Sequence, residues 1–345
     1  MELGKIKDRF IAFADSECKG NSELYYKLSY QMANEEELLK IASNTRAGQP
    51  IPNIFLASVH YLLLKNQEIE LAKYYPSIQK NQVAEIPFSL FKSFCIENKN
   101  EIMSLISTRI VQTNVINRCS YLMPIFSKII AEEKRPTTII DIGTSAGLTL
   151  NFDKYEYWYN DQKLYGESNV IVKSNILKSY MPTIHPITHS ISKIGIDQNI
   201  IDPTNKDEIL WLKALIWTDQ LERFIAIEEA LKLDELTEIK FIQAETIADF
   251  ETEISKVDKV QNLIIYATHV LYQFPQEQKE AFYSMLERTG QDRDFYFLSV
   301  EGIEILLERY KSKEIVIELT EYKDKQKTEI LIAETNGHGN WIRWN

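Results

Sequence analysis

Apolar residues in the first third of the chain recur every three or four positions, as they do on one face of a helix. Two such series are Ile6, Phe10, Phe13 and Ala14, and then Leu24, Leu28 and Met32. No convincing alternation of apolar and polar residues, the pattern of a half-buried strand, occurs before about residue 110. The pattern therefore predicts an all-helical N-terminal domain over residues 1–110.

The segment Thr113–Glu133 is typical of one long helix that opens the second domain. Its apolar residues form a stripe, and another face carries Asn114, Asn117, Arg118 and Tyr121 at helical spacing. Because this helix leads directly into the first expected strand, we expect the two to be antiparallel neighbours. Counting back from the end of the helix then puts the polar face level with the carboxyl end of that strand.

From residue 138 onward, short apolar runs alternate with helical segments. The expected strands are 138–141, 191–196, 239–242, 262–266 and 295–300, and the main helices between them are 207–233 and 276–288. This alternation is typical of a mostly parallel sheet with helices on both faces. Two later apolar segments, 314–319 and 328–333, flank a polar turn and predict a C-terminal antiparallel hairpin. The sequence thus predicts an α/β second domain over residues 111–345.

One insertion interrupts this scheme before the second core strand. Tyr155, Tyr157 and Tyr159 alternate with polar residues, Asn160-Asp161 supplies a turn, and residues 169–173 are again strand-like. We interpret residues 155–175 as a small β excursion. It is either an aromatic hairpin that packs on its neighbours or a lid over a binding site.

Charge and composition narrow the classes of partner. The chain has 39 Lys and Arg against 50 Asp and Glu residues, a formal charge of −11, which disfavours a nucleic-acid partner. Neither the cysteines nor the histidines have the spacing of a metal site. The N-terminus lacks the apolar core of a signal peptide, and the longest apolar run, Ile54–Leu64, is too short to cross a membrane. We expect a cytoplasmic protein with a small-molecule substrate and no membrane partner; the oligomeric state is not indicated.

The segment that carries chemistry is Asp141-Ile142-Gly143-Thr144-Ser145-Ala146-Gly147, between the first strand and a short expected helix. Doubly wound folds bind ligands here, beyond the carboxyl ends of the strands. We expect Gly143 to permit a tight turn, Gly147 to permit close approach of the backbone, and the helix N-terminus to offer N–H groups. The spacing is that of the first motif of methyltransferases, with Ser145 in place of a middle glycine. Asp141, Gly143, Ser145 and Gly147 are therefore predicted to bind S-adenosylmethionine.

Further residues are expected to complete this site. Asp197 follows the second core strand, where a carboxylate can accept hydrogen bonds from a ribose. Arg118 and Asn114 are expected at the level of the cofactor, with Arg118 clamping its methionine carboxylate. His269, after the fourth core strand, is a candidate general base, and Tyr272 a candidate for orienting the substrate.

Two other functions fit parts of the pattern. The letters GTSAG also match the G-x-S-x-G nucleophile elbow of serine hydrolases, especially the patatin-type lipases. A hydrolase of this kind needs a glycine-rich oxyanion loop before residue 141 and a later Asp-Gly, or an acid and then a histidine. The sequence contains no such loop and no Asp-Gly. A cofactor-binding or interaction protein without catalysis is the other alternative.

Seven segments distributed along the whole chain carry a resemblance: PNIFLASVHYLL (52–63), YYPS (74–77), RIVQTNVINRCSYLMP (109–124), DIGTSAGL (141–148), GIDQNIIDP (195–203), WLKALIW (211–217) and HGNWIRW (338–344). Nearly end to end, the chain resembles a bacterial family of unknown function with a class I methyltransferase-like fold. The resemblance implies a Rossmann-like domain and an S-adenosylmethionine site, and it implies no particular substrate. We therefore predict an S-adenosylmethionine-dependent methyltransferase of small molecules whose helical domain covers the active-site cleft.

Overall fold

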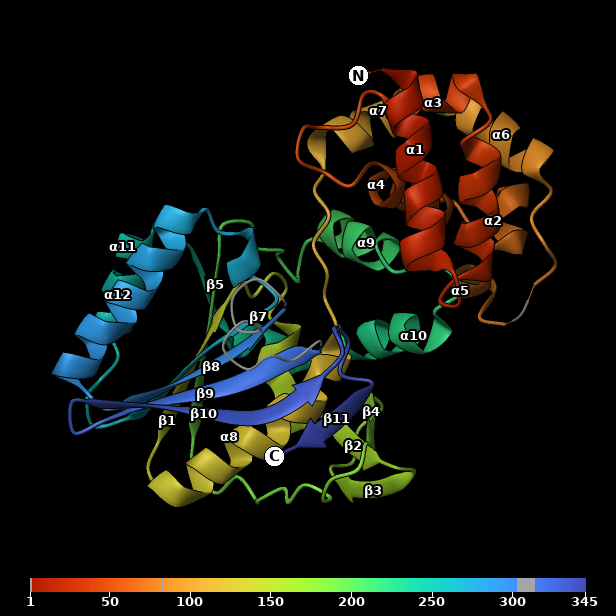
Figure 1. Ribbon diagram of the computed structural model, residues 1–345. Helices are drawn as coiled ribbons and strands as arrows, with labels where there is room; N and C mark the ends of the chain where they lie inside the picture. The colour runs from red at the N-terminus through yellow and green to blue at the C-terminus, as the bar shows by residue number, and fades with distance from the viewer. Residues whose placement is uncertain (1, 82, 303–313) are drawn as a thin grey trace. The chain divides into compact units, whose positions relative to one another are not determined.

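The computed structural model describes residues 2–81, 83–302 and 314–345 (Figure 1). The chain forms two compact units. The first consists of Met1–Thr113 and Thr204–Glu228, and the second of Asn114–Pro203 and Glu229–Asn345. The sequence pattern predicts that residues 204–228 belong to the second domain, whereas in the structure they pack with the N-terminal helices.

The first unit is built from helices in the part of it that the structure describes, as predicted. Its helices are α1 (Leu3–Phe13), η1 (Ala14–Cys18), α2 (Glu23–Met32), α3 (Glu36–Ala42), α4 (Ile51–Lys65), η2 (Glu70–Tyr74), α5 (Pro76–Gln79), α6 (Phe88–Glu97), α7 (Lys99–Thr108), α9 (Lys206–Ala214) and most of α10 (Leu221–Ala230). Helix α4 is central because it is apolar on all sides and buries 13 of its 15 residues.

Side-chain contacts explain why residues 204–228 join this unit. Trp211 of α9 donates its indole N–H to the carbonyl of Ile110 at 2.9 Å, and its ring lies edge-on to that of Tyr61 on α4. The buried His60 of α4 spans the same junction, since its two ring nitrogens lie 3.1 Å from the Ala214 carbonyl and 2.8 Å from the Ser77 hydroxyl. Trp211 and Ala214 are more than 100 residues from Ile110, Tyr61 and His60 in the chain, so no local sequence pattern predicts these contacts.

The second unit contains one sheet of eleven described strands, in the order β3-β2-β4-β11-β10-β9-β8-β7-β1-β5-β6. Their bounds are β1 Thr137–Ile142, β2 Glu156–Tyr159, β3 Gln162–Tyr165, β4 Ile171–Ile176, β5 Ile191–Asp197, β6 Lys240–Gln243, β7 Asn262–Thr268, β8 Phe295–Glu301, β9 Ile315–Lys323, β10 Gln326–Thr335 and β11 Trp341–Trp344. The five strands from β6 to β8 are mutually parallel, and β9 and β10 form the predicted antiparallel hairpin.

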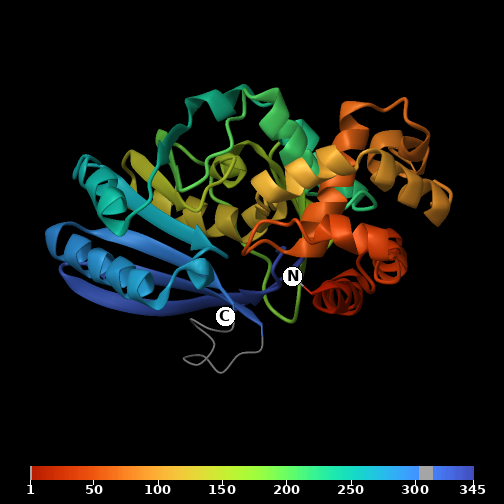
Figure 2. The same ribbon diagram turned by 90° about the horizontal axis from the view of Figure 1, so that it is seen from above.

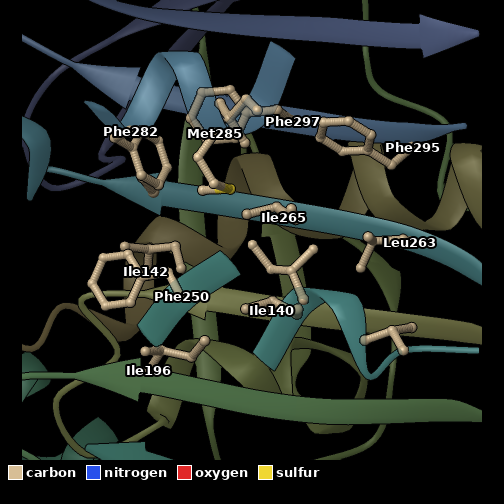
Figure 3. Close-up of a cluster of buried hydrophobic side chains, with 14 of the residues drawn as sticks. Ile140, Ile142, Ile196, Phe250, Leu263, Ile265, Phe282, Met285, Phe295 and Phe297 are labelled. Carbon is tan, nitrogen blue, oxygen red and sulfur yellow. The ribbon is translucent and has the colours of Figure 1, made fainter. Parts of the chain in front are cut away.

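Helices cover both faces of the parallel strands. On one face, α11 (Ile247–Ser255) and α12 (Gln276–Asp292) contribute Phe250, Phe282 and Met285 to an apolar core with Ile140 and Ile265 of the sheet (Figure 3). Figure 2 shows α12 lying along the strands. On the opposite face, Phe126 of α8 (Cys119–Glu133) packs edge-on against Tyr266 of β7. Strands buried on both faces are apolar over most of their length, which is why short apolar runs predicted them.

Helix α8 is shorter than the predicted helix Thr113–Glu133. The segment before it is a single 3-10 turn, η3 (Ile116–Arg118), and Val115 has an extended backbone. Asn114 therefore lies outside the helix and does not share a helical face with Tyr121, contrary to the expectation. The polar residues Asn114 and Asn117 bond to other segments of the chain instead of continuing the helical ladder.

The insertion folds as a β excursion that extends the sheet at its far edge through β4 and β11. Tyr155, Tyr157 and Tyr159 are fully buried, and their hydroxyls donate to the backbone carbonyls of Leu148, Phe152 and Ser120 at 2.5 Å. The aromatic face is thus part of the core, which agrees with the packing interpretation and not with a lid. In the described parts of the chain, no helix combines the length and apolar character needed to span a membrane.

Candidate functional site

The glycine loop begins where β1 ends, and it is held in a left-handed conformation. Gly143, Ser145 and Gly147 all have positive φ angles, of 80°, 52° and 72°. A Cβ atom on Gly143 would lie 2.6 Å from Val270, and one on Gly147 would lie 2.8 Å from Phe241. Both glycines are therefore required by the backbone angle and by packing against protein. For Gly147 this differs from the expected approach to a ligand.

The N–H groups of this loop bond mainly to the neighbouring strand β5. Those of Gly143 and Thr144 both donate to the carbonyl of Ile196, at 2.8 and 3.3 Å. The N–H of Ser145 donates to the carboxylate of Asp197 at 2.8 Å. The loop therefore has few free donors for a bound anion.

A 3-10 helix, η4 (Leu148–Lys154), follows the loop where the sequence predicted a short helix with an anion-binding N-terminus. Its seven residues include a non-helical Asn151, and the insertion follows directly. The N–H of Gly147 donates to Thr144 within the turn. The N–H groups of Gly143, Thr144, Ser145 and Gly147 are thus already used within the protein, which leaves fewer donors for an anion at this helix end.

Asp197 connects the ends of β1 and β5. One carboxylate oxygen accepts from Ser145, and the other accepts from the N–H of Asn199 at 2.9 Å. Burial raises the pKa of Asp197 above its usual range, and the hydrogen bonds from Asn199 and Ser145 oppose that rise. An ionised carboxylate has about four acceptor positions, so Asp197 retains capacity for further hydrogen bonds.

Asn114 and Ser145 were both expected at the site, and the structure brings them together. The side-chain amide of Asn114 donates to the Ser145 hydroxyl at 2.9 Å. Ser145 has the positive φ of a nucleophile elbow, yet it is only 6% exposed. Its described side-chain partner is an amide, which cannot take up a proton as a catalytic base does.

Asp141 faces the side of the sheet that α8 covers. The residue is 3% exposed, and its carboxylate accepts from the Thr149 hydroxyl at 2.9 Å. Burial raises the pKa of Asp141 to about 7, although hydrogen bonds from Thr149 and Tyr266 oppose the rise. Asp141, at the start of the glycine loop, is therefore linked to η4 by a buried hydrogen bond.

A second group of polar residues lies at the ends of β7 and β8. Arg118 is 9% exposed and donates to the carbonyls of Thr268 and Gly337, each at 3.3 Å. Because Ala267 pairs with Ile142, the guanidinium lies beside the start of the glycine loop. No ion pair of Arg118 is found among the described residues, and three of its five N–H donors are left for other partners.

Glu301, the last residue of β8, completes this group, and it was not among the residues predicted from the sequence. It is fully buried, and one carboxylate oxygen accepts from the N–H groups of Val270 and Leu271 at 3.0 Å. The other oxygen has no partner among the described residues, and neither has the Tyr121 hydroxyl. The signal that could have found Glu301 is an acid ending the otherwise apolar run Phe295–Val300.

The pKa values of His269 and Glu301 are shifted in opposite directions. Burial, reinforced by the charges of Arg118 and His338, lowers the pKa of His269 to about 3. Burial raises the pKa of Glu301 to about 7, against the opposing effect of the hydrogen bonds from Leu271 and Val270. A base works best when its pKa is near the working pH, so Glu301 suits proton transfer at neutral pH better than His269 does.

The remaining expected residue, Tyr272, is 52% exposed in the 3-10 turn η6 (Leu271–Gln273) that Glu301 caps. No group of three or more His, Cys, Asp or Glu side chains in the described residues is arranged to hold a metal ion. Three segments thus meet at this edge of the sheet: the glycine loop, the end of β5, and the ends of β7 and β8.

The comparisons with known proteins concern the whole chain. A family model described as "uncharacterized protein conserved in bacteria (DUF2332)" matches residues 7–344. The resemblance to a bacterial family, nearly end to end, is therefore confirmed. A search of curated proteins finds no match.

Proposed function

We propose that this chain, which belongs to the bacterial family DUF2332, is an S-adenosylmethionine-dependent methyltransferase that acts on a small molecule. One observation carries the proposal. The glycine loop after β1 and the acid at the end of β5 are joined directly, through the hydrogen bond from Ser145 N–H to Asp197. This arrangement combines the two elements that a nucleoside cofactor needs, a close-packed turn and a ribose acceptor.

The strand order supports a Rossmann-like domain for this function. Numbered along the chain, the parallel strands β6-β5-β1-β7-β8 have the order 3-2-1-4-5, which is that of dinucleotide-binding folds. The order reverses at β1, so the glycine loop lies at the topological switch point. Ligands of such folds bind there, outside the carboxyl ends of the strands.

The hydrogen bonds at this edge favour a cofactor without phosphate. A pyrophosphate requires free backbone N–H groups, and those of Gly143, Thr144 and Ser145 are already used within the protein. A ribose requires an acceptor, which Asp197 retains. S-adenosylmethionine offers a ribose, an amino acid and a sulfonium, and no phosphate. The residues present therefore fit it better than NAD or a nucleoside triphosphate.

The roles that we propose follow from these contacts. Asp197 would bind the ribose, and Arg118, with its spare N–H donors, the methionine carboxylate. When bound, S-adenosylmethionine supplies an electrophilic methyl group. Glu301 would accept the proton that the methyl acceptor loses, a role that the low pKa of His269 makes it unsuited to fill at neutral pH.

The test is calorimetric titration with S-adenosylhomocysteine and, separately, NAD. We expect saturable binding of the first and none of the second. Asp197→Ala should weaken binding by roughly tenfold to a hundredfold, because hydrogen bonds to a charged group contribute about 1.5–3 kcal/mol. Asp197→Asn keeps an acceptor for Ser145 and should lose less. Asp292→Ala, which removes an exposed acid on α12 paired with Lys259, is the control.

Two outcomes would contradict this proposal. If neither S-adenosylmethionine nor S-adenosylhomocysteine gives heat or a thermal shift at millimolar concentration, the chain is not a methyltransferase. Binding that persists without turnover on any acceptor would favour the non-catalytic alternative.

The serine hydrolase alternative has one observation in its favour, the positive φ of Ser145. The burial of the Ser145 hydroxyl and its hydrogen bond from Asn114 oppose it.

A further inference from the structure

A pocket of about 450 Å³ lies on the small β excursion, away from the glycine loop in sequence. Its lining includes Trp158 of β2, Ile171, Lys173 and Asn175 of β4, Asp161 from the turn between β2 and β3, and Asn340 before β11. The volume falls within the range of small-molecule sites. Neither the family match nor the proposed methyl transfer accounts for it.

The sheet register builds this pocket from alternate residues. In the parallel pairing of β2 with β4, Trp158 is the partner of Lys173, and Ile171 and Asn175 share the exposed side of β4 with that lysine. Asn340 closes one end, because its carbonyl accepts from the N–H of Asn175 at 2.9 Å. The pocket floor is therefore held by backbone pairing.

The charges in the pocket differ from those beside it. Glu156 and Lys163, on neighbouring strands, neutralise each other in an ion pair of 2.7 Å. Lys173 and Asp161 both line the pocket, and within the described chain neither has an ion-pair partner within 4.0 Å, including each other. Two opposite charges that face one pocket without pairing are complementary to a ligand that carries both signs.

We propose that this pocket binds a zwitterionic ligand with an apolar side chain, either a free α-amino acid or a short peptide whose two ends carry the charges. Lys173 would bind its carboxylate and Asp161 its ammonium group. Trp158 and Ile171 supply apolar surface for the side chain, and the amides of Asn175 and Asn340 can donate and accept further hydrogen bonds. Ile171 is 43% exposed, so a ligand would cover apolar surface that now faces solvent.

The experiment uses three matched probes and the full-length chain without any cofactor. L-leucine carries both charges, 4-methylpentanoate lacks the ammonium group, and 3-methylbutylamine lacks the carboxylate. Binding is measured by calorimetry or ligand-observed NMR at up to about 10 mM. We expect L-leucine to bind about threefold to fivefold more tightly than either analogue, because each analogue lacks one of the two partly exposed charge pairs. Leucyl-leucine separates a free amino acid from a peptide as the preferred form.

Variants assign the two charges. Lys173→Met should remove the preference for L-leucine over 3-methylbutylamine and leave its preference over 4-methylpentanoate. Asp161→Asn should do the reverse; Asn tolerates the positive φ of this turn, which is 62° at Asp161. Lys163→Met, which removes a lysine from the same excursion but outside the pocket, should change neither preference.

The proposal is overturned if L-leucine and leucyl-leucine show no saturable binding, or if both single-charge analogues bind as tightly as L-leucine. It is also overturned if Lys163→Met changes the preferences as much as Lys173→Met. Because no cofactor is present, these outcomes are independent of whether the chain binds S-adenosylmethionine.

Discussion

Replacing Glu301 with glutamine tests whether its carboxyl group is as buried as its contacts indicate. Glutamine has nearly the same shape, and its side-chain oxygen can still accept from Val270 and Leu271. It cannot ionise. The variant therefore isolates the free-energy cost of holding a negative charge at the end of β8, where one carboxylate oxygen has no described partner.

The free-energy cost of ionising Glu301 follows from its pKa, which burial raises from 4.5 to about 7. An acid whose pKa is higher in the folded chain binds its proton more tightly there, so stability falls as the pH rises from 4.5 to about 7. At about 1.36 kcal/mol per pKa unit, ionised Glu301 lowers the free energy of unfolding by about 3 kcal/mol above pH 7. Below pH 4.5 this cost is absent, because the carboxyl group is protonated in both states.

The measured quantity is the stability of Glu301→Gln minus that of wild type, at about pH 4.5 and again at about pH 8. Urea unfolding followed by pulsed hydrogen exchange in peptides from β7 and β8 reports on the second unit alone. The difference should be about 3 kcal/mol more positive at the higher pH. Changes in packing cancel between the two pH values. Glu280→Gln, an exposed acid on α12, is the control. A difference that does not vary with pH would refute the inferred burial of the charge.

Two further predictions concern the glycine loop. Gly143→Ala should destabilise the second unit by roughly 1–3 kcal/mol, through the positive φ and the contact with Val270, and Val270→Ala should recover the steric part; an unaffected thermal unfolding temperature would contradict this. A fluorophosphonate probe should not label Ser145, because its hydroxyl is buried and bonded to Asn114. Stoichiometric labelling, lost in Ser145→Ala, would overturn the methyltransferase proposal.

The sequence determined the elements whose pattern is local. The strands β1, β7 and β8 are buried on both faces, so each is a short, mostly apolar run that stands out from its polar surroundings. The β9–β10 hairpin was likewise visible as two apolar segments around a polar turn. Gly143 predicted a tight turn after β1, and the turn has the positive φ that glycine adopts without steric cost.

Local pattern failed where a boundary depends on partners elsewhere. The helical spacing of Asn114 and Asn117 predicted a longer helix, but their amides bond to Ser145 and to the end of the chain. The helical pattern of residues 204–228 does not indicate which unit they join, and the contacts of Trp211 with Tyr61 and of Ala214 with His60 decide it.

The candidate site shows the same division. The sequence predicted Asp197 and Ser145 as site residues, and the structure places them in one hydrogen bond because β5 pairs with β1 in one register. It identified His269 by residue type, whereas burial beside Arg118 removes the basicity that this type implies. Glu301 emerged only from the fold, since an acid is noticed when it is buried without a full set of partners. The local sequence determines which helix or strand each segment can form. The low dielectric and the unpaired polar groups that shift pKa values arise only where distant segments meet.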